Sequence, residues 1–320
     1  MARKALKVEW ATNQTWNLED IVGMTKVGQG EATVIQKAGD TDELFEEAES
    51  DEVLSLEFSS PIGAHAQLEP NGATAIVKDG KATVWLSTQV PAVTLNEVAD
   101  RLGMDKDNVN IIPQYLGGGF GRRLHTPNAM QAAVMSQAVD GRPVKSFFDR
   151  KQEFQNDTFR PPTHHVMRGR LDESGNIAAL EHSFSSGDVA FNSAIFPAAA
   201  RPVIGADIGA IRGGMIMYRN IPNIKATSWH VDLPFATSWW RSLGLLANTF
   251  AIESFVDELA IKAERNAVDF RLAHLPDTEA GTRMANVIKA CTEKAGYSEA
   301  VTNGRAMGFA ASVDAGSPCA

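Results

Sequence analysis

Gly117-Gly118-Gly119-Phe120-Gly121-Arg122-Arg123 is the stretch that decides how this sequence is interpreted. The apolar run 109–116 before it predicts a buried strand, and residues 129–138 after it have helical spacing. Glycines let a backbone adopt positive φ and approach a ligand closely, while the two arginines add fixed positive charge. A strand, a glycine turn and a helix in this order predict a site where backbone amides hold an anionic group.

The alternative is a tight, solvated turn with a basic end. Phe120 argues against it, because a simple turn has no need of a bulky side chain among glycines, whereas a shaped pocket does. Two known phosphate-binding motifs do not fit. A Walker loop needs Gly-Lys-Ser/Thr after Gly121, and the dinucleotide fingerprint needs a glycine where Arg122 or Leu124 stands. An ordinary nucleotide-binding domain is therefore disfavoured.

The composition is that of a globular protein. The 320 residues are 44% apolar and 8% aromatic. A formal net charge of −9 argues against a nucleic-acid partner, which calls for a basic face. No apolar run approaches the roughly 20 residues of a transmembrane helix. Two cysteines, Cys291 and Cys319, cannot by themselves form an iron–sulfur or zinc site.

Strands and helices interleave along the chain, and hairpins are prominent. Hairpin turns are predicted at Asp79-Gly80 and at 172–175, and the strongest helical pattern covers 248–264. Residues 188–216 have little periodicity and are predicted to form a long loop with functional contacts. The run 308–313 predicts a further strand. Together these patterns predict an α+β fold with mixed sheets and packed helices.

Two further segments carry groups suited to a polar ligand. Residues 237–244 place Arg241 and a glycine just before the long helix, which is an anion-binding arrangement. Packing of Arg241 over its two neighbouring tryptophans by cation–π contact remains an equal alternative. Gln89 ends the second strand of the first predicted hairpin. Its amide can donate and accept at once, although a polar residue that simply finishes a strand is common.

The histidines do not predict a metal site. His65 and Glu69 stand four residues apart, but Pro70 follows at once, so we expect a buried hydrogen-bonded pair. His164 and His165 adjoin a strand, where successive side chains point to opposite faces. No metal ligand is therefore predicted.

Taken in this order, the segments resemble the large, molybdenum-binding subunit of the xanthine dehydrogenase/aldehyde oxidase family. The likeness is strongest to the isoquinoline 1-oxidoreductase beta-subunit type. The segments that carry it are 65–70, 84–89, 117–123, 218–223, 240–244 and 250–260. Each segment is a weak signal, and their order makes a specific one. The match runs from about residue 50 to 313.

The resemblance implies a molybdopterin-binding domain and a molybdenum–molybdopterin cytosine dinucleotide cofactor. The implied cofactor-binding residues are Gln89, Gly118, Gly119, Phe120, Gly121, Arg122 and Arg241. Gln89 would hydrogen-bond an oxo ligand of molybdenum, and the glycine backbone would line the face of the metal. Phe120 would bound the substrate pocket. Arg122 and Arg241 would serve the anionic portion of the cofactor.

The resemblance also implies a reaction and a partner. An N-heterocycle or an aldehyde would be hydroxylated with oxygen from water. The electrons would leave through [2Fe–2S] centres on a separate iron–sulfur small subunit, which agrees with the two cysteines of this chain. The implied division is a partial N-terminal segment 1–50, a first molybdopterin-binding domain 51–275 and the start of a following segment 276–320.

One feature departs from the family pattern. The family has its catalytic glutamate in a Gly-x-Gly-Glu segment, and none follows Arg241 here. Residues 28–31 have the same letters but precede every other motif, so no catalytic residue is assigned. The sequence therefore predicts a large-subunit fragment that is inactive as it stands. The alternatives are a non-catalytic interaction or assembly module, and a general anion-binding protein that uses Arg122 and Arg241.

Overall fold

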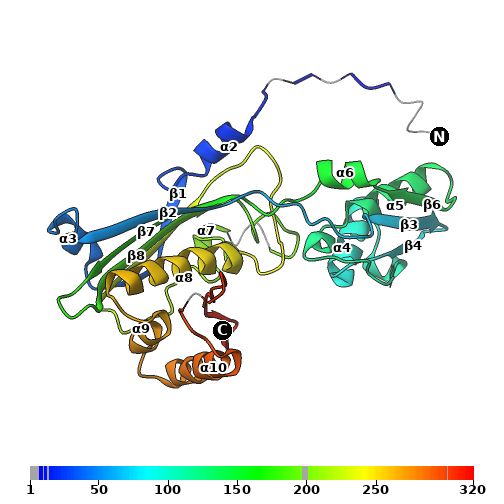
Figure 1. The fold of residues 1–320 in the computed structure, drawn as a ribbon. Helices are drawn as coiled ribbons and strands as arrows, with labels where there is room; N and C mark the ends of the chain where they lie inside the picture. The colour runs from blue at the N-terminus through cyan, green and yellow to red at the C-terminus, as the bar shows by residue number, and fades with distance from the viewer. Residues whose placement is uncertain (1–6, 10, 13, 197–200, 301) are drawn as a thin grey trace.

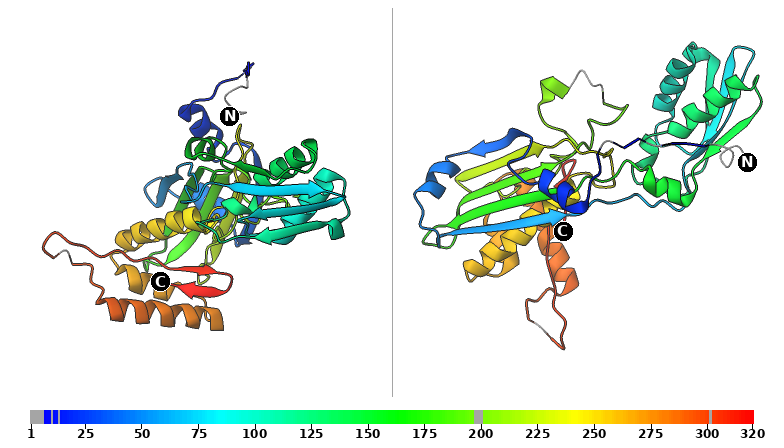
Figure 2. Two further views of the ribbon diagram at one scale, coloured as in Figure 1. Left: turned by 90° about the vertical axis from the view of Figure 1, so that its right-hand side faces the viewer. Right: turned by 90° about the horizontal axis from the view of Figure 1, so that it is seen from above.

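A computed structural model describes residues 7–9, 11, 12, 14–196, 201–300 and 302–320 of the chain. Two lobes lie side by side, a larger one on a five-stranded sheet and a smaller one on a four-stranded sheet (Figure 1). In the view from above they meet over a narrow junction (Figure 2). Among the described residues, no helix combines the length and apolarity that crossing a membrane requires.

The large lobe is a mixed sheet with the strand order β1-β9-β8-β7-β2. Only the β8–β9 pair is parallel. The strands are β1 (Glu31–Ala38), β9 (Asn223–His230), β8 (Ile177–Ser186), β7 (Thr163–Leu171) and β2 (Val53–Ser60). β1 comes from the first 50 residues, so this part of the chain belongs to the same sheet as β2, β7, β8 and β9.

One long helix, α8 (Leu245–Lys262), covers one face of this sheet (Figure 1). Its apolar positions recur with helical spacing, so Ile252, Phe255 and Leu259 all face the core. The remaining helices of this lobe are α2 (Leu18–Met24), α3 (Thr41–Glu46), α7 (Arg201–Ile204), α9 (Ala267–Ala273) and α10 (Glu279–Ala295).

The small lobe has the strand order β5-β4-β3-β6, with two helices on one face. Its core is built from small apolar residues, which let α5 lie close to β3. The strands are β3 (Gly72–Lys78), β4 (Lys81–Leu86), β5 (Val109–Pro113) and β6 (Val144–Phe147). The helices are α4 (Pro91–Leu102), α5 (Pro127–Ala138) and α6 (Arg150–Gln155), with 3₁₀ turns η1 (Lys106–Asn108) and η2 (Arg122–Leu124).

The structure confirms the predicted α+β fold of mixed sheets and packed helices. Asp79 and Gly80 both have positive φ, 51° and 71°, in the turn between β3 and β4. The hairpin at 172–175 is also present, between β7 and β8. The predicted loop 188–216 contains the short helix α7, and its residues 197–200 lie outside the described residues.

The strand predicted at 308–313 is wrong for most of its length. Only β10 (Ser312–Asp314) is a strand, paired with β11 (Ser317–Cys319). Before it, the N–H of Ala311 donates to Glu253 Oε2 at 2.7 Å instead of joining a ladder. A buried carboxylate on α8 therefore takes the hydrogen bond that an adjacent strand would have accepted.

Two buried histidines, His165 and His182, are hydrogen-bonded to each other in the core of the large lobe. As predicted, neighbouring histidines on β7 face opposite ways: His164 reaches Glu57 near the surface, and His165 is fully buried. His182 Nδ1 lies 2.9 Å from the carbonyl oxygen of Gly214, which can only accept, so this nitrogen carries the proton. In the neutral ring, His182 Nε2 then accepts from His165 Nδ1 at 3.0 Å.

We expect this histidine pair to lower the stability of the protein in weak acid. Burial lowers the pKa of His182 to about 4 and that of His165 well below its ordinary value. Above pH ~6.5, the ordinary pKa of histidine, both rings are neutral in the folded and the unfolded chain. Below it, only the unfolded chain takes up the protons. We expect the free energy of unfolding to fall by up to about 1.4 kcal/mol per pH unit for each ring.

Urea unfolding between pH 7 and 4.5 measures this slope. The double variant His165→Gln, His182→Gln should flatten it, whatever its stability at pH 7. An equal slope in both proteins would show that other groups cause the acid sensitivity.

Candidate functional site

The glycine loop (residues 117–123) lies at the junction of the lobes, after β5, and its last two residues begin η2. Gly121 N–H donates to Gln89 Oε1 at 3.2 Å, which ties the loop to the end of the first hairpin. Arg241 N–H donates to the carbonyl oxygen of Phe120 at 2.8 Å, which ties it to the segment before α8. The structure thus brings together three segments that the sequence singled out separately.

The glycines of the loop are required by what packs against them. A Cβ on Gly119 would lie 2.7 Å from Gln89 Oε1, and one on Gly121 would lie 2.4 Å from the carbonyl oxygen of Trp239. Gly121 also has a φ of +106°, a backbone conformation that residues other than glycine rarely adopt. The loop is a close-contact surface shared by two neighbouring segments, and this explains why glycine recurs in it.

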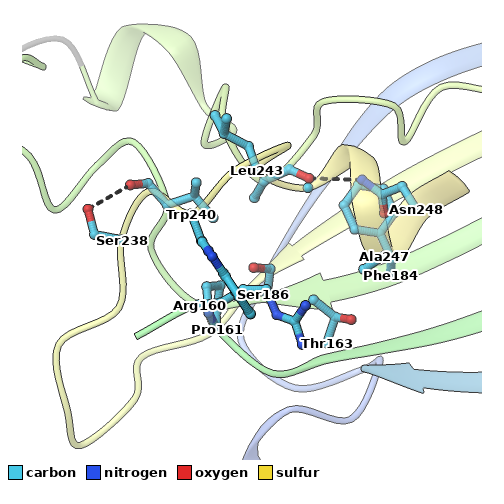
Figure 3. Close-up of a pocket in the computed structure, with 13 residues that line it drawn as sticks. Arg160, Pro161, Thr163, Phe184, Ser186, Ser238, Trp240, Leu243, Ala247 and Asn248 are labelled. Atoms are coloured by element: carbon cyan, nitrogen blue, oxygen red, sulfur yellow. Dashed lines mark hydrogen bonds between the residues drawn. The ribbon is translucent and has the colours of Figure 1, made fainter. Parts of the chain in front are cut away.

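Phe120 and Arg241 are exposed side chains of the site and lie beside each other. Phe120 has φ 57° and is 43% exposed, and the guanidinium of Arg241 lies 5.7 Å from its ring centroid. Arg241 therefore packs on the ring of Phe120. It does not pack on the neighbouring tryptophans, contrary to the cation–π alternative. Trp240 is covered instead by Arg160, at 4.5 Å from the centroid, as Figure 3 shows.

The cavity beside Trp240 is closed by packing. It lies where the start of α8 meets the sheet, and residues such as Leu243 and Asn248 line it together with Phe184 (Figure 3). Its volume of about 10 Å³ holds no more than one water molecule. This part of the junction therefore holds the segments together and leaves no room for a ligand.

The backbone just after Arg241 is strained. Ser242 and Leu243 are consecutive residues with left-handed φ values of 75° and 54°, immediately before α8. Each such residue costs on the order of 1 kcal/mol, and strain of this kind concentrates at functional sites. It presents the Arg241 side chain outward while Gly244 N–H donates to the carbonyl oxygen of Gly209 at 3.0 Å.

The two arginines that end the glycine loop face inward. Arg122 is 1% exposed, and its Nε lies 2.9 Å from a carboxylate oxygen of both Glu153 and Asp157. Arg123 is equally buried and donates to the carbonyl oxygen of Gly118 at 2.6 Å and to Glu69 at 2.8 Å. Arg122 therefore braces the loop in this structure, whereas the Arg241 side chain beside the loop is exposed.

The predicted pairing of His65 with Glu69 is wrong. His65 is buried and hydrogen-bonded, as expected, but its partner is Asp157, with Nδ1 2.9 Å from Oδ1. Glu69 turns to Arg123 instead, because the glycine loop places that guanidinium beside it. Within the described ranges, no group of three or more acidic, histidine or cysteine side chains could hold a metal ion.

Asp207 is a residue that the sequence analysis missed. It is 1% exposed, and its carboxylate organises the loop 188–216 by accepting backbone hydrogen bonds over 2.7–3.1 Å. The donors are the N–H groups of Val189, Ala190, Phe191, Gly209 and Ala210. The turn Asp207-Ile208-Gly209 is a local signal that could have been noticed. The bonds to residues 189–191 have no local signal.

Comparison with known proteins identifies the class of this chain. Residues 26–275 match the molybdopterin cofactor-binding domain family, and the chain belongs to that family. Among solved structures, quinoline 2-oxidoreductase from Pseudomonas putida 86 has the same fold, with a TM-score of 0.69 over 83% of this chain and 35% of that one, at 20% identity. The predicted family is confirmed.

Curated relatives are enzymes of larger size. The chain is 28% identical over 260 residues to isoquinoline 1-oxidoreductase subunit beta of Brevundimonas diminuta, covering 81% of this chain and 33% of that one. It is 32% identical over 254 residues to the aldehyde oxidoreductase molybdenum-binding subunit PaoC of Escherichia coli (strain K12), covering 78% and 32%.

A third relative carries a different cofactor in its name. The chain is 29% identical over 336 residues to a membrane-bound aldehyde dehydrogenase [pyrroloquinoline-quinone] of Gluconacetobacter polyoxogenes, covering 97% of this chain and 42% of that protein. The chain thus spans less than half the length of each of these relatives.

Proposed function

We propose that this chain is the first cofactor-binding part of a molybdenum hydroxylase large subunit that holds molybdopterin cytosine dinucleotide. The intact protein would hydroxylate an N-heterocycle or an aldehyde with oxygen from water. One observation carries the proposal: Gln89 and Arg241, 152 positions apart by their numbers, both bond to the glycine loop. The names of the relatives, which include an isoquinoline and an aldehyde oxidoreductase, support the substrate class.

The exposed groups fit an anionic, polar cofactor. Gln89 Oε1 is occupied by Gly121 N–H, and Nε2 has no hydrogen-bond partner among the described residues, so it is free to donate to a metal-bound oxygen ligand. Arg241 is an exposed cation beside the loop. A Cβ on Gly119 or Gly121 would collide with Gln89 or Trp239, so these glycines allow the loop backbone to lie directly against both segments. When bound, the molybdenum group supplies the two-electron redox chemistry.

The residues have separate roles in this proposal. Gln89 orients the cofactor by its amide, Arg241 neutralises its negative charge, and Phe120 excludes water and borders the substrate. Arg122 acts on the anionic portion indirectly, since its buried ion pairs hold the glycine loop in place. We further propose that [2Fe–2S] centres on a small partner subunit take the electrons, and that residues 51–275 form the first cofactor-binding domain.

The decisive experiment uses the full-length protein with its iron–sulfur partner. Molybdenum is measured by mass spectrometry, cytidine monophosphate is released by acid hydrolysis, and pyrroloquinoline quinone is measured in the same extract. We expect equimolar molybdenum and nucleotide, and no quinone. The absence of both molybdenum and nucleotide would overturn the enzyme hypothesis and favour a non-catalytic interaction or assembly module. The 320-residue chain alone should be inactive, because no Gly-x-Gly-Glu segment follows Arg241.

Arg241→Ala should weaken cofactor binding in that full-length protein. A charge-assisted contact to an anion contributes about 1.5–3 kcal/mol, so we expect affinity to fall roughly 10- to 100-fold. The measurement is molybdenum and nucleotide content after dialysis. Arg101→Ala is the matched control, since Arg101 is an exposed arginine in the last turn of α4. Equal content in both variants would remove Arg241 from the cofactor site.

A further inference from the structure

Both ring nitrogens of His65 face groups that only accept hydrogen bonds. Nδ1 lies 2.9 Å from Asp157 Oδ1, and Nε2 lies 2.6 Å from the carbonyl oxygen of Trp239. A carbonyl oxygen and an ionised carboxylate have no proton to donate. Each ring nitrogen must therefore carry its own proton, which makes His65 an imidazolium ion. Its side chain is completely buried.

The buried charges around this ion balance. Asp157 Oδ1 also lies 2.9 Å from Arg122 Nε, and the same Nε lies 2.9 Å from Glu153 Oε1. Two cations and two carboxylates thus form one network, and no side chain of the four is more than 2% exposed. Buried charges persist when they are paired in this way, and removing one partner leaves a costly orphan.

The neighbouring titratable groups agree with this assignment. Burial raises the pKa of Asp157, but hydrogen bonds from His65 and the charge of Arg122 outweigh it and hold the pKa below its ordinary value. His125 faces the same network, and its Nε2 lies 2.7 Å from Ser238 Oγ. Burial and the positive charges of Arg122 and His65 lower the pKa of His125 to about 4, so it stays neutral.

The network connects the two segments that border the site. Arg122 belongs to the glycine loop, and Trp239 belongs to the segment 237–244 that carries Arg241. The carbonyl oxygen of Trp239 that His65 binds is the same atom that approaches Gly121. We propose that His65 and Asp157 are positioning residues, an imidazolium–carboxylate clamp that holds residues 239–243 against the glycine loop. The proposal rests on the proposed function only in treating these segments as the border of a cofactor site.

Nitrogen NMR of the isotopically labelled 320-residue chain tests the charge of His65 directly. At pH 7 we expect both ring nitrogens of His65 to show the chemical shifts of a protonated imidazolium, with the signals assigned by their loss in His65→Gln. A single unprotonated ring nitrogen at pH 7 would overturn the clamp. This measurement needs no folded variant of Asp157.

Hydrogen exchange tests the positioning role. In Asp157→Asn we expect the amides of residues 119–124 and 239–243 to exchange at least about tenfold faster than in the unmodified chain, a change of about 1.4 kcal/mol. Glu253→Gln is the matched control, because Glu253 is also a buried carboxylate paired with an arginine, Arg271 at 2.9 Å, but within the large lobe.

The two variants separate a local clamp from general destabilisation. Faster exchange confined to residues 119–124 and 239–243 in Asp157→Asn, and absent there in Glu253→Gln, would support the clamp. Unchanged exchange in Asp157→Asn, or the same pattern in both variants, would refute it. Since neither readout involves a cofactor, failure of the clamp is distinguishable from failure of the proposed function.

Discussion

Asp207→Ala is expected to lower the free energy of unfolding by about 4 kcal/mol. The substitution removes an acceptor that serves the N–H groups of five residues in the loop 188–216. These donors lie around a carboxylate that is only 1% exposed, so little water can replace it without opening the loop. A buried donor left without a partner costs about 1–3 kcal/mol, and the cost accumulates until the loop rearranges.

Urea unfolding of both chains measures this difference. Asp188→Ala is the control from the same loop, because Asp188 is 28% exposed and pairs with His230 at 2.9 Å. A partly exposed pair of this kind contributes less than about 1 kcal/mol. Equal losses of unfolding free energy in the two variants would show that the backbone hydrogen bonds to Asp207 do not stabilise the loop more than the Asp188–His230 pair does.

Gly121→Ala should be the most damaging change within the glycine loop. Its φ of +106° is outside the range that an alanine adopts, and the new Cβ would lie 2.4 Å from the carbonyl oxygen of Trp239. This oxygen is backbone and is also bound by His65, so it cannot move away alone. We expect a loss of at least about 3 kcal/mol and separation of the loop from residues 239–243.

Gly103→Ala separates the two causes of that loss. Gly103 caps α4 with φ +64°, and no atom lies within 4 Å of a Cβ built there. Only the backbone penalty applies to it, about 1 kcal/mol. Thermal and urea unfolding give the loss of unfolding free energy in each variant. The difference between the two losses is the cost of the close contact at Gly121. Losses of the same size would mean that the contact with Trp239 relaxes freely.

Local sequence signals predicted the elements well. The Asp79-Gly80 turn, the turn at 172–175 and the apolar stripe of α8 each depend on residues within a few positions of one another. Backbone preferences and side-chain periodicity act over that range, so a sequence reports them directly. The exception at 308–311 has a long-range cause, because the acceptor for Ala311 N–H is on α8.

The candidate site was predictable only as a set of parts. The order of the segments around Gln89, the glycine loop and Arg241 identified a family resemblance, and the family match over residues 26–275 confirms it. The partners of the charged side chains were not predictable in the same way. His65 was expected to pair within its own segment, yet it binds Asp157, 92 positions further along the chain.

The sequence by itself determined the fold class, most of the secondary-structure elements and the family, because these follow from local preferences and from the order of motifs. Only the tertiary structure decided which way each charge faces. Arg122 turns into the protein and Arg241 remains exposed, although both adjoin the same loop. The physical reason is that a buried charge takes whichever opposite charge the packed backbone brings within about 3 Å, and for Arg122 those groups are Glu153 and Asp157.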